Sequence, residues 1–141
     1  MELRIKNSAL HIELNTSEKI LTLHGSFVLP WSHITEVKAT EPESKWWDIR
    51  APGTFLPGVI KAGTHYTKRG KEFWCYKKGK KPLVLELRNE SYKRVILGLE
   101  DAAAWQEELQ GRVRKDMQSK AANVEEYLRA PNKMKTNVES R

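Results

Sequence analysis

The residues of this chain that could bind a charged ligand gather in one short basic segment. Residues 61–81 contain eight Lys or Arg against one Asp or Glu, so this segment alone accounts for the net charge of +7 of the 141-residue chain. The cations surround two glycine-containing turns, TKRGKE and YKKGKKP. They are Lys68, Arg69, Lys71, Lys77, Lys78, Lys80 and Lys81. Such a concentration of charge attracts phosphates, anionic lipid or an acidic protein surface, and it also keeps a β-protein soluble.

The two basic turns are separated by a strand-like run, EFWCYK. A strand of about six residues is roughly 20 Å long at ~3.3 Å per residue, so the turns should lie at opposite ends of it. We therefore expect a diffuse attraction to polyanions and no single tight phosphate site. The aromatic residues of the run, Phe73, Trp74 and Tyr76, could stack on nucleic-acid bases. Packing into a core is the alternative use of at least one face.

A pair of tryptophans, Trp46 and Trp47, stands in a charged stretch over residues 40–49. An exposed pair would anchor a protein partner or a membrane interface. A buried pair would instead cap one end of a barrel. The sequence leaves both interpretations open.

The stretch RAPGTFLPGVIKAGTHY (50–66) holds Gly53, Gly58 and Gly63 at five-residue intervals. These glycines match neither the dinucleotide nor the P-loop spacing, and they open no helix that could bind a phosphate. Glycine inside strands usually marks bulges and close approaches. We predict that the stretch bends a sheet, with Gly63 leaving room for a helix or a bulky aromatic.

Catalytic chemistry has little support in the sequence. The four histidines are scattered without a second ligand at metal spacing, and Cys75 reads as a small buried residue within a strand. No nucleophile, base and orienting group can be assembled, so we expect no enzyme, no metal and no small-molecule cofactor. A single cysteine, the absence of an apolar run of about 20 residues and an N-terminus unlike a signal peptide predict a cytoplasmic protein.

Period-2 alternation of apolar residues predicts a series of strands before residue 100. LHIEL and KILTLHG read as a hairpin, residues 26–39 as a third strand that is broken or bent at Pro30, and PLVLELR and KRVILGL as a second hairpin. EFWCYK is apolar on both faces, as expected for a strand near a barrel seam or under another element. From Asp101, the pattern changes to helical spacing. An N-cap residue precedes an apolar stripe of Ala102, Trp105, Leu109 and Val113. About seven strands followed by one helix predict a mostly β (α+β) domain, either an antiparallel barrel or a strongly bent sandwich.

The segment after this stripe has a weaker pattern. AANVEEYLR could extend the helix or form a short second one, and Pro131 ends any helix. We therefore predict a domain over residues 1–116 and a basic C-terminal tail over 117–141 that is partly helical or mobile.

Together, these residues resemble the pleckstrin-homology (PH) superfold, and more specifically an uncharacterised group of bacterial PH-like proteins. The resemblance covers roughly residues 9–115. It is carried by LPWSHITEV (29–37), the glycine stretch (50–66), GKEFW (70–74), PLVLELRNESYKRVILGLED (82–101) and DAAAWQEEL with Trp105. It implies about seven antiparallel strands in a two-sheet bent barrel, with one open end plugged by a C-terminal helix.

The lipid-binding signature of PH domains, alternating basic residues along the first hairpin, is not present here. LNTSEKILTLH offers Lys19 alone beside Glu18. We therefore expect a non-catalytic binding or scaffolding module that acts through a protein partner or self-association. The alternative is peripheral binding to anionic membranes through the basic turns and the tryptophan pair. Nonspecific nucleic-acid binding is a third reading of the same charges.

Overall fold

The computed structural model of the chain describes residues 1–41, 49–56 and 60–131, with the backbone alone in 49–56. The first sheet has the order β1-β2-β3, with strands Glu2–Ile5, Ala9–Glu13 and Phe27–Pro30. The second has the order β4-β8-β9-β7-β6-β5. Its strands in chain order are Ile34–Lys38, Ile49–Leu56, Ile60–Thr67, Gly70–Lys77, Lys81–Leu87 and Arg94–Leu99. The helices are α1 (Thr16–Thr22), the 3-10 turn η1 (Trp31–His33) and α2 (Ala102–Arg129).

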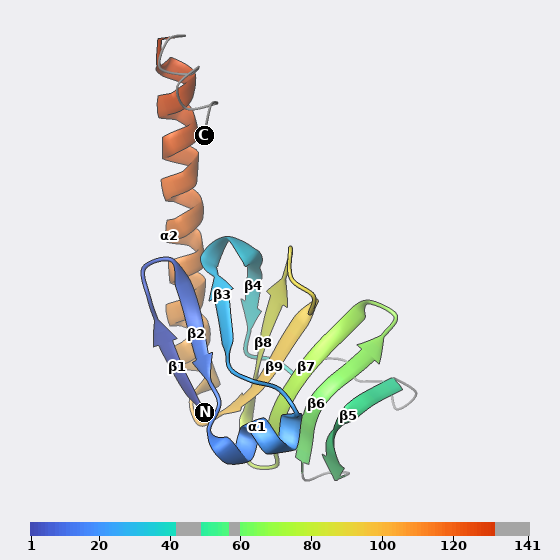
Figure 1. Ribbon diagram of the computed structural model, residues 1–141. Coiled ribbons are helices and arrows are strands. Elements are labelled where there is room, and N and C mark those ends of the chain that lie inside the picture. Colours follow the sequence, from blue (N-terminus) through green and yellow to red (C-terminus); the bar gives the residue numbers. More distant parts are fainter. Residues whose placement is uncertain (42–48, 57–59, 132–141) are drawn as a thin grey trace.

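The mixed α+β class is confirmed, but the closed barrel is not. In the part of the chain that the structure describes, two open sheets face each other around the core (Figure 1). β7 and β9 pair in parallel, so the expectation of an entirely antiparallel arrangement is wrong. The long alternating run over 26–39 is split as Pro30 suggested: β3 lies in the first sheet, η1 turns the chain, and β4 starts the second sheet.

The first part of KILTLHG, residues 19–22, belongs to helix α1 and Leu23 caps that helix, which corrects the prediction of a strand. A capping box starts the helix. Asn15 Oδ1 accepts a hydrogen bond from the Glu18 backbone N–H at 2.8 Å, and Glu18 Oε1 accepts one from the Asn15 N–H at 2.9 Å. These bonds satisfy two amides that a helix start otherwise leaves unpaired. Because the segment is helical, Ile20 and Leu23 are exposed instead of alternating into the core.

The core lies between the two sheets and the first half of α2. The predicted inward positions of β2 and β8 are buried, and so are Phe73 on β7 and Val95 and Leu97 on β9. Trp31 fills the corner at η1 and donates its indole N–H to the Lys6 carbonyl at 3.0 Å. Ala102, Leu109 and Val113 of α2 are buried against this core, while Trp105 packs at its edge, partly exposed.

The glycine stretch behaves in part as predicted. β5 and β6 form a hairpin whose register shifts between Arg50 and Gly53, the bulge expected there. Gly63 has φ +119° and lies directly opposite Trp74 on β7. Gly58 falls outside the described residues.

Helix α2 is one continuous helix to Arg129, so the expected domain boundary at residue 116 falls inside it. It stands along the side of the sheets and extends far beyond them (Figure 1). No helix among the described residues is long and apolar enough to cross a membrane.

Candidate functional site

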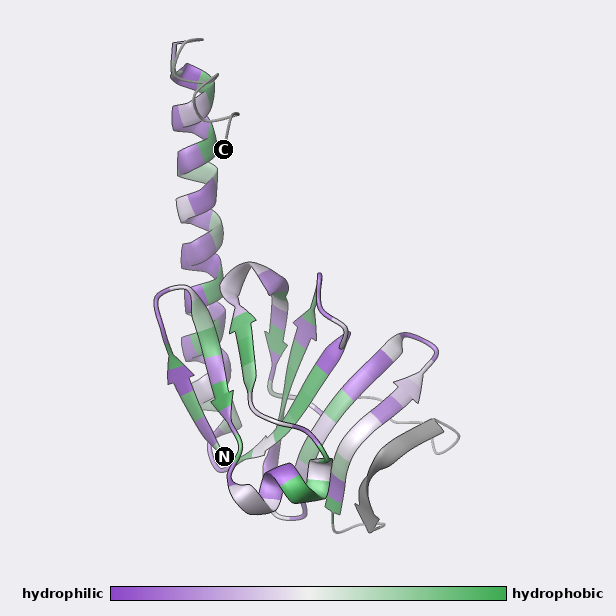
Figure 2. Ribbon diagram, viewed as in Figure 1, coloured by the Kyte–Doolittle hydropathy of each residue, from purple (hydrophilic) through white to green (hydrophobic). Residues whose placement is uncertain are grey.

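The part of α2 beyond Val113 carries an apolar stripe that the two sheets leave uncovered. We call residues 114–129 the distal segment. Every residue from Met117 to Glu126 is exposed, and the exposed fractions of Met117, Val124 and Leu128 are 57%, 55% and 62%. Ala121 completes the stripe, and hydrophobic positions recur along this part of the helix in Figure 2. Exposed apolar residues aligned along one helix are typical of a surface that binds protein.

The proximal half of α2, residues 102–113, holds the distal segment in place. Gln110 Oε1 accepts a hydrogen bond from the Val37 N–H at 3.1 Å, and Gln106 Nε2 donates to the Val37 carbonyl at 3.4 Å. On the other side of the helix, Arg112 Nη2 donates to the Asn7 carbonyl in the β1–β2 turn at 3.2 Å. These bonds, with the buried Leu109, fix the direction in which the distal segment leaves the sheets.

Charge is unevenly distributed along the distal segment. Its first half, residues 114–120, holds three cations against Asp116, a net charge of +2, and its second half, residues 121–129, holds Glu125 and Glu126 against Arg129, a net charge of −1. Within the first half, Lys120 pairs with Asp116 at 3.5 Å. The two halves of the segment therefore carry net charges of opposite sign.

The predicted basic residues divide between the two ends of β7, as the strand length suggested. Lys68 and Arg69 stand in the β6–β7 turn, and the turn after β7 carries the second lysine group. Gly70 and Gly79 adopt positive φ in these turns, as a hairpin loop favours. Among these cations, Lys71 lies over the Tyr92 ring at 4.4 Å, and Lys80 pairs with Glu100.

The sequence did not indicate three further cations at the N-terminal end of β7, namely Arg88, Lys93 and Arg94. The parallel pairing of β7 with β9 brings the β8–β9 turn beside the β6–β7 turn, and the Lys93 N–H donates to the Lys71 carbonyl at 2.7 Å. The Lys93 side chain packs over Gly70, where a Cβ would lie 2.6 Å from Lys93 Cγ. The resulting group, which we call the basic end, is formed by Lys68, Arg69, Lys71, Arg88, Lys93 and Arg94.

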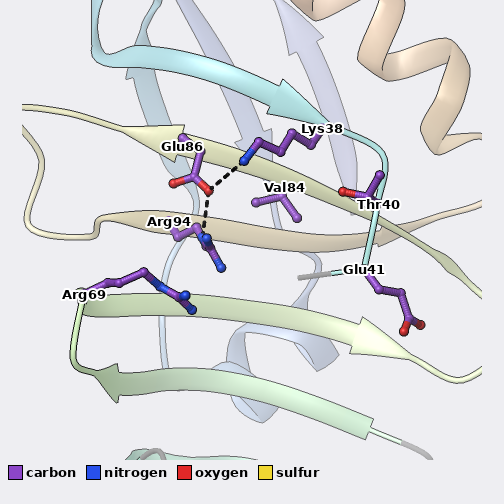
Figure 3. Close-up of a pocket in the computed structure, with 7 residues that line it drawn as sticks. All are labelled: Lys38, Thr40, Glu41, Arg69, Val84, Glu86 and Arg94. Carbon is purple, nitrogen blue, oxygen red and sulfur yellow. Dashed lines mark hydrogen bonds and ion pairs between the residues drawn. The ribbon is translucent and has the colours of Figure 1, made fainter. Parts of the chain in front are cut away.

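Below the basic end, a cavity of about 280 Å³ opens on the face of the second sheet that points away from the core (Figure 3). Glu86 is one of its lining residues. It accepts a hydrogen bond from Arg94 Nε at 2.8 Å and pairs with Lys38 Nζ at 3.9 Å, beside the apolar side chain of Val84. The cavity is therefore lined by charges that already pair with one another.

Arg94 also reaches a buried carboxylate, Glu72, which is 2% exposed. Glu72 Oε2 lies 3.4 Å from both Arg94 Nη1 and Arg69 Nη2, and its Oε1 accepts the indole N–H of Trp74 at 3.2 Å. Together with the pairs of Glu86, these contacts join β4, β7, β8, β9 and the β6–β7 turn through one ionic network.

Cys75 is buried, as predicted, at the edge of a second cavity of about 430 Å³. Burial, and to a smaller extent the nearby Glu18 carboxylate, raises the pKa of the Cys75 thiol from 9.0 to about 11. The thiol lies 3.9 Å from Glu18 Oε2, while Glu18 Oε1 pairs with the Met1 amine at 2.7 Å. A thiol with a raised pKa is a weak nucleophile at neutral pH.

The remaining candidate residues form no further cluster in the described ranges. His33 pairs with Glu90 at 2.8 Å, and His65 is buried beside Trp74. Residues 1–41, 49–56 and 60–131 contain no group of three His, Cys, Asp or Glu side chains that could hold a metal ion. Trp46 and Trp47 lie outside the described residues, so the structure does not decide between an exposed anchor and a buried cap.

Comparison with known proteins found no matching family model, no similar curated protein and no similar solved structure. The relation to PH-like proteins therefore stays a prediction.

Proposed function

We propose that the chain is a non-catalytic binding module that recognises protein through the apolar stripe of the distal segment. In this proposal the chain is a cytoplasmic bacterial PH-like protein, and its sheets are the scaffold that holds α2. The observation that carries the proposal is the continuation of the stripe past Val113, the last buried residue of the helix.

The energetic argument concerns Met117, Val124 and Leu128. Full burial of one such side chain is worth about 1.5–3 kcal/mol relative to leaving it in water. Contact with a complementary surface would bury all three at once, on a helix whose direction is already fixed by Gln106 and Gln110. A preorganised surface loses less conformational entropy on binding, so even a small apolar stripe can bind.

Site-specific photo-crosslinking in cells that express the protein tests this proposal. A photoreactive amino acid at Val124 should give a covalent adduct with a protein. The same amino acid at Ser119, which is exposed on the opposite side of the helix, should not. Equal adduct formation at both positions, or none at Val124, would contradict the proposal.

A second candidate function, peripheral binding to anionic membranes, is favoured by one observation. The fold places the β8–β9 turn beside the β6–β7 turn, so Arg88 and Lys93 join the three cations that the sequence suggested at the basic end. The sixth cation, Arg94, is 13% exposed and pairs with Glu72 and Glu86, so it adds little to the surface charge. Basic clusters attract anionic lipid by about 1 kcal/mol per Lys or Arg near the surface. Nucleic-acid binding would rest on the same charges and has no separate structural support.

Co-sedimentation with vesicles across a range of salt tests the membrane function. If it holds, binding to phosphatidylserine-containing vesicles should fall steeply with salt. It should also weaken strongly in Lys68→Glu/Lys93→Glu and far less in Lys77→Glu/Lys78→Glu, the matched change at the other end of β7. Salt-independent binding, or equal loss in both double variants, would refute a specific role of the basic end.

A further inference from the structure

We propose that the distal segment of α2 pairs in antiparallel orientation with the same segment of a second copy of this chain. This inference rests on the proposed function and names the partner of the same surface. Three observations carry it: the spacing of the stripe, the position of β4, and the distribution of charge along the helix.

The stripe has the spacing of a two-helix seam. Met117, Ala121, Val124 and Leu128 follow one another at intervals of four, three and four residues. That alternation is the a/d pattern by which two helices interdigitate side chains along a common seam. The stripe is as narrow as the seam that a second helix covers, so we take a helix as the partner.

The position of β4 decides the orientation. Gln106 precedes Val124 by 18 residues and Gln110 precedes Leu128 by 18, which is five full turns at 3.6 residues per turn. Gln106 therefore lies on the same side of α2 as Val124, and Gln110 lies on the same side as Leu128. Both glutamines bond to Val37, so β4 occupies that side of the proximal half. A parallel partner helix would collide with β4 beside the proximal half of α2. An antiparallel partner helix ends beside Met117, before it reaches β4.

The charges favour the same orientation. In an antiparallel pair, the half of each distal segment with net negative charge, residues 121–129, lies beside the half of the other with net positive charge, residues 114–120. A parallel pair would align basic with basic and acidic with acidic, which is unfavourable. The antiparallel register places Met117 against the partner's Leu128 and Ala121 against the partner's Val124.

The overlap is short, so the dimer should dissociate on dilution. About 14 paired residues extend over roughly 21 Å at 1.5 Å per residue. Such a contact falls at the small end of specific interfaces. Sedimentation velocity of the full chain from about 10 µM to about 1 mM should show a mass that rises from 16.3 kDa toward twice that value.

Matched variants test the surface. Val124→Glu should abolish the rise in mass, and Ser119→Glu, which adds the same charge on the opposite side, should leave it unchanged. Both positions are exposed, so circular dichroism should show intact folding in each variant. A chain that stays monomeric at every concentration, or a dimer equally sensitive to both changes, would overturn the inference.

Disulfide cross-linking tests the orientation. Met117 and Leu128 are separated by about 16 Å along the helix, and a disulfide requires Cα atoms within about 7 Å. Oxidation of a mixture of Met117→Cys and Leu128→Cys chains should therefore give a cross-linked dimer, while each variant alone should give no more than the unmodified chain with its buried Cys75. Cross-linking of each variant alone would show a parallel pair and refute the proposal.

The two proposals fail in distinguishable ways. If the purified chain is monomeric while Val124 gives adducts with a different protein in cells, the second copy is excluded and the binding surface stands. If Val124 gives no adduct and the purified chain is monomeric, both proposals fall.

Discussion

Replacing Glu72 by glutamine should destabilise the protein far more than removing a carboxylate from its surface. Glu72 is 2% exposed and lies 3.4 Å from the guanidinium of Arg94, which is itself 13% exposed. Removing one partner of a buried ion pair typically costs about 3–5 kcal/mol, because the other charge stays buried. Arg94 keeps its bond to Glu86, so we expect the lower end of that range, about 3 kcal/mol. Glutamine retains the size of the side chain and an acceptor for the Trp74 indole, so the loss reports the charge.

A double-mutant cycle isolates the contribution of the pair. The free energy of unfolding would be measured by urea denaturation, followed by far-UV circular dichroism, for Glu72→Gln, Arg94→Met and the double variant. We expect a coupling energy of about 2 kcal/mol, since contacting residues in one network couple by about 0.5–3 kcal/mol.

The matched control is the surface pair of Glu2 and Arg4. These residues lie 3.1 Å apart with exposed fractions of 63% and 47%. Exposed pairs are screened by water and contribute little, so the cycle of Glu2→Gln and Arg4→Met should give a much smaller coupling energy than the cycle of Glu72 and Arg94. A loss below about 1 kcal/mol for Glu72→Gln, with coupling no larger than in the control cycle, would refute the reasoning that burial strengthens this network.

Three further predictions concern other parts of the fold. The raised pKa of the Cys75 thiol stabilises the fold below pH 9, and this contribution is lost as pH rises from 9.0 to about 11, because only the unfolded thiol ionises in that range. The stability advantage of the wild type over Cys75→Ala should therefore shrink by up to about 3 kcal/mol between pH 8 and 11, measured by urea denaturation. Asn15→Ala removes the acceptor for the Glu18 amide and should cost about 1 kcal/mol in the same assay, whereas an unchanged stability would mean that α1 needs no cap. Leu109→Ala should cost about 2–5 kcal/mol because Leu109 is fully buried, while Leu128→Ala on the same helix should change the stability of the monomer by less than about 0.5 kcal/mol; equal losses would show that the distal segment is packed in the monomer.

The sequence predicted the parts of the fold that depend on local pattern. Alternation placed Leu10, Ile12 and Leu14 in the core, and the break at Pro30 marked the change of sheet. The start of α2 followed from Asp101, whose side chain accepts a hydrogen bond from the Ala104 N–H. In each case neighbouring residues determine the outcome, so no knowledge of the tertiary structure was needed.

The strand predicted over KILTLHG failed because two local signals disagreed. Alternating apolar residues favour a strand, but NTSE is also a capping-box sequence, and in the structure the box starts a helix. The box is supported by tertiary contacts, since Glu18 also pairs with the Met1 amine and is buried. Those contacts are invisible to a local pattern, and they leave Ile20 exposed to solvent.

The ionic network and the three further cations of the basic end, Arg88, Lys93 and Arg94, could not be predicted, since both depend on β7 pairing with β9. These strands are separated in sequence by β8, and their parallel pairing places Arg94 beside Glu72 and Lys93 beside Lys71. From the sequence alone, Arg94 belongs to a different hairpin from Glu72. The lining of the cavity in Figure 3 therefore follows from topology, and no short motif carries it.

The length of α2 links the scaffold to the proposed interaction. An isolated helix of about 16 residues is marginal in water, because nucleating the first turn is unfavourable. The distal segment avoids that cost, since it continues a helix already formed by the burial of Leu109 and Val113. The sheets thus supply the nucleus for a helix that they do not cover, and the apolar stripe is presented in a fixed direction before any partner arrives. A short seam of four residues would bind weakly if the helix had to fold on contact. On a helix that is already formed and anchored, the same four residues retain most of their burial energy for association.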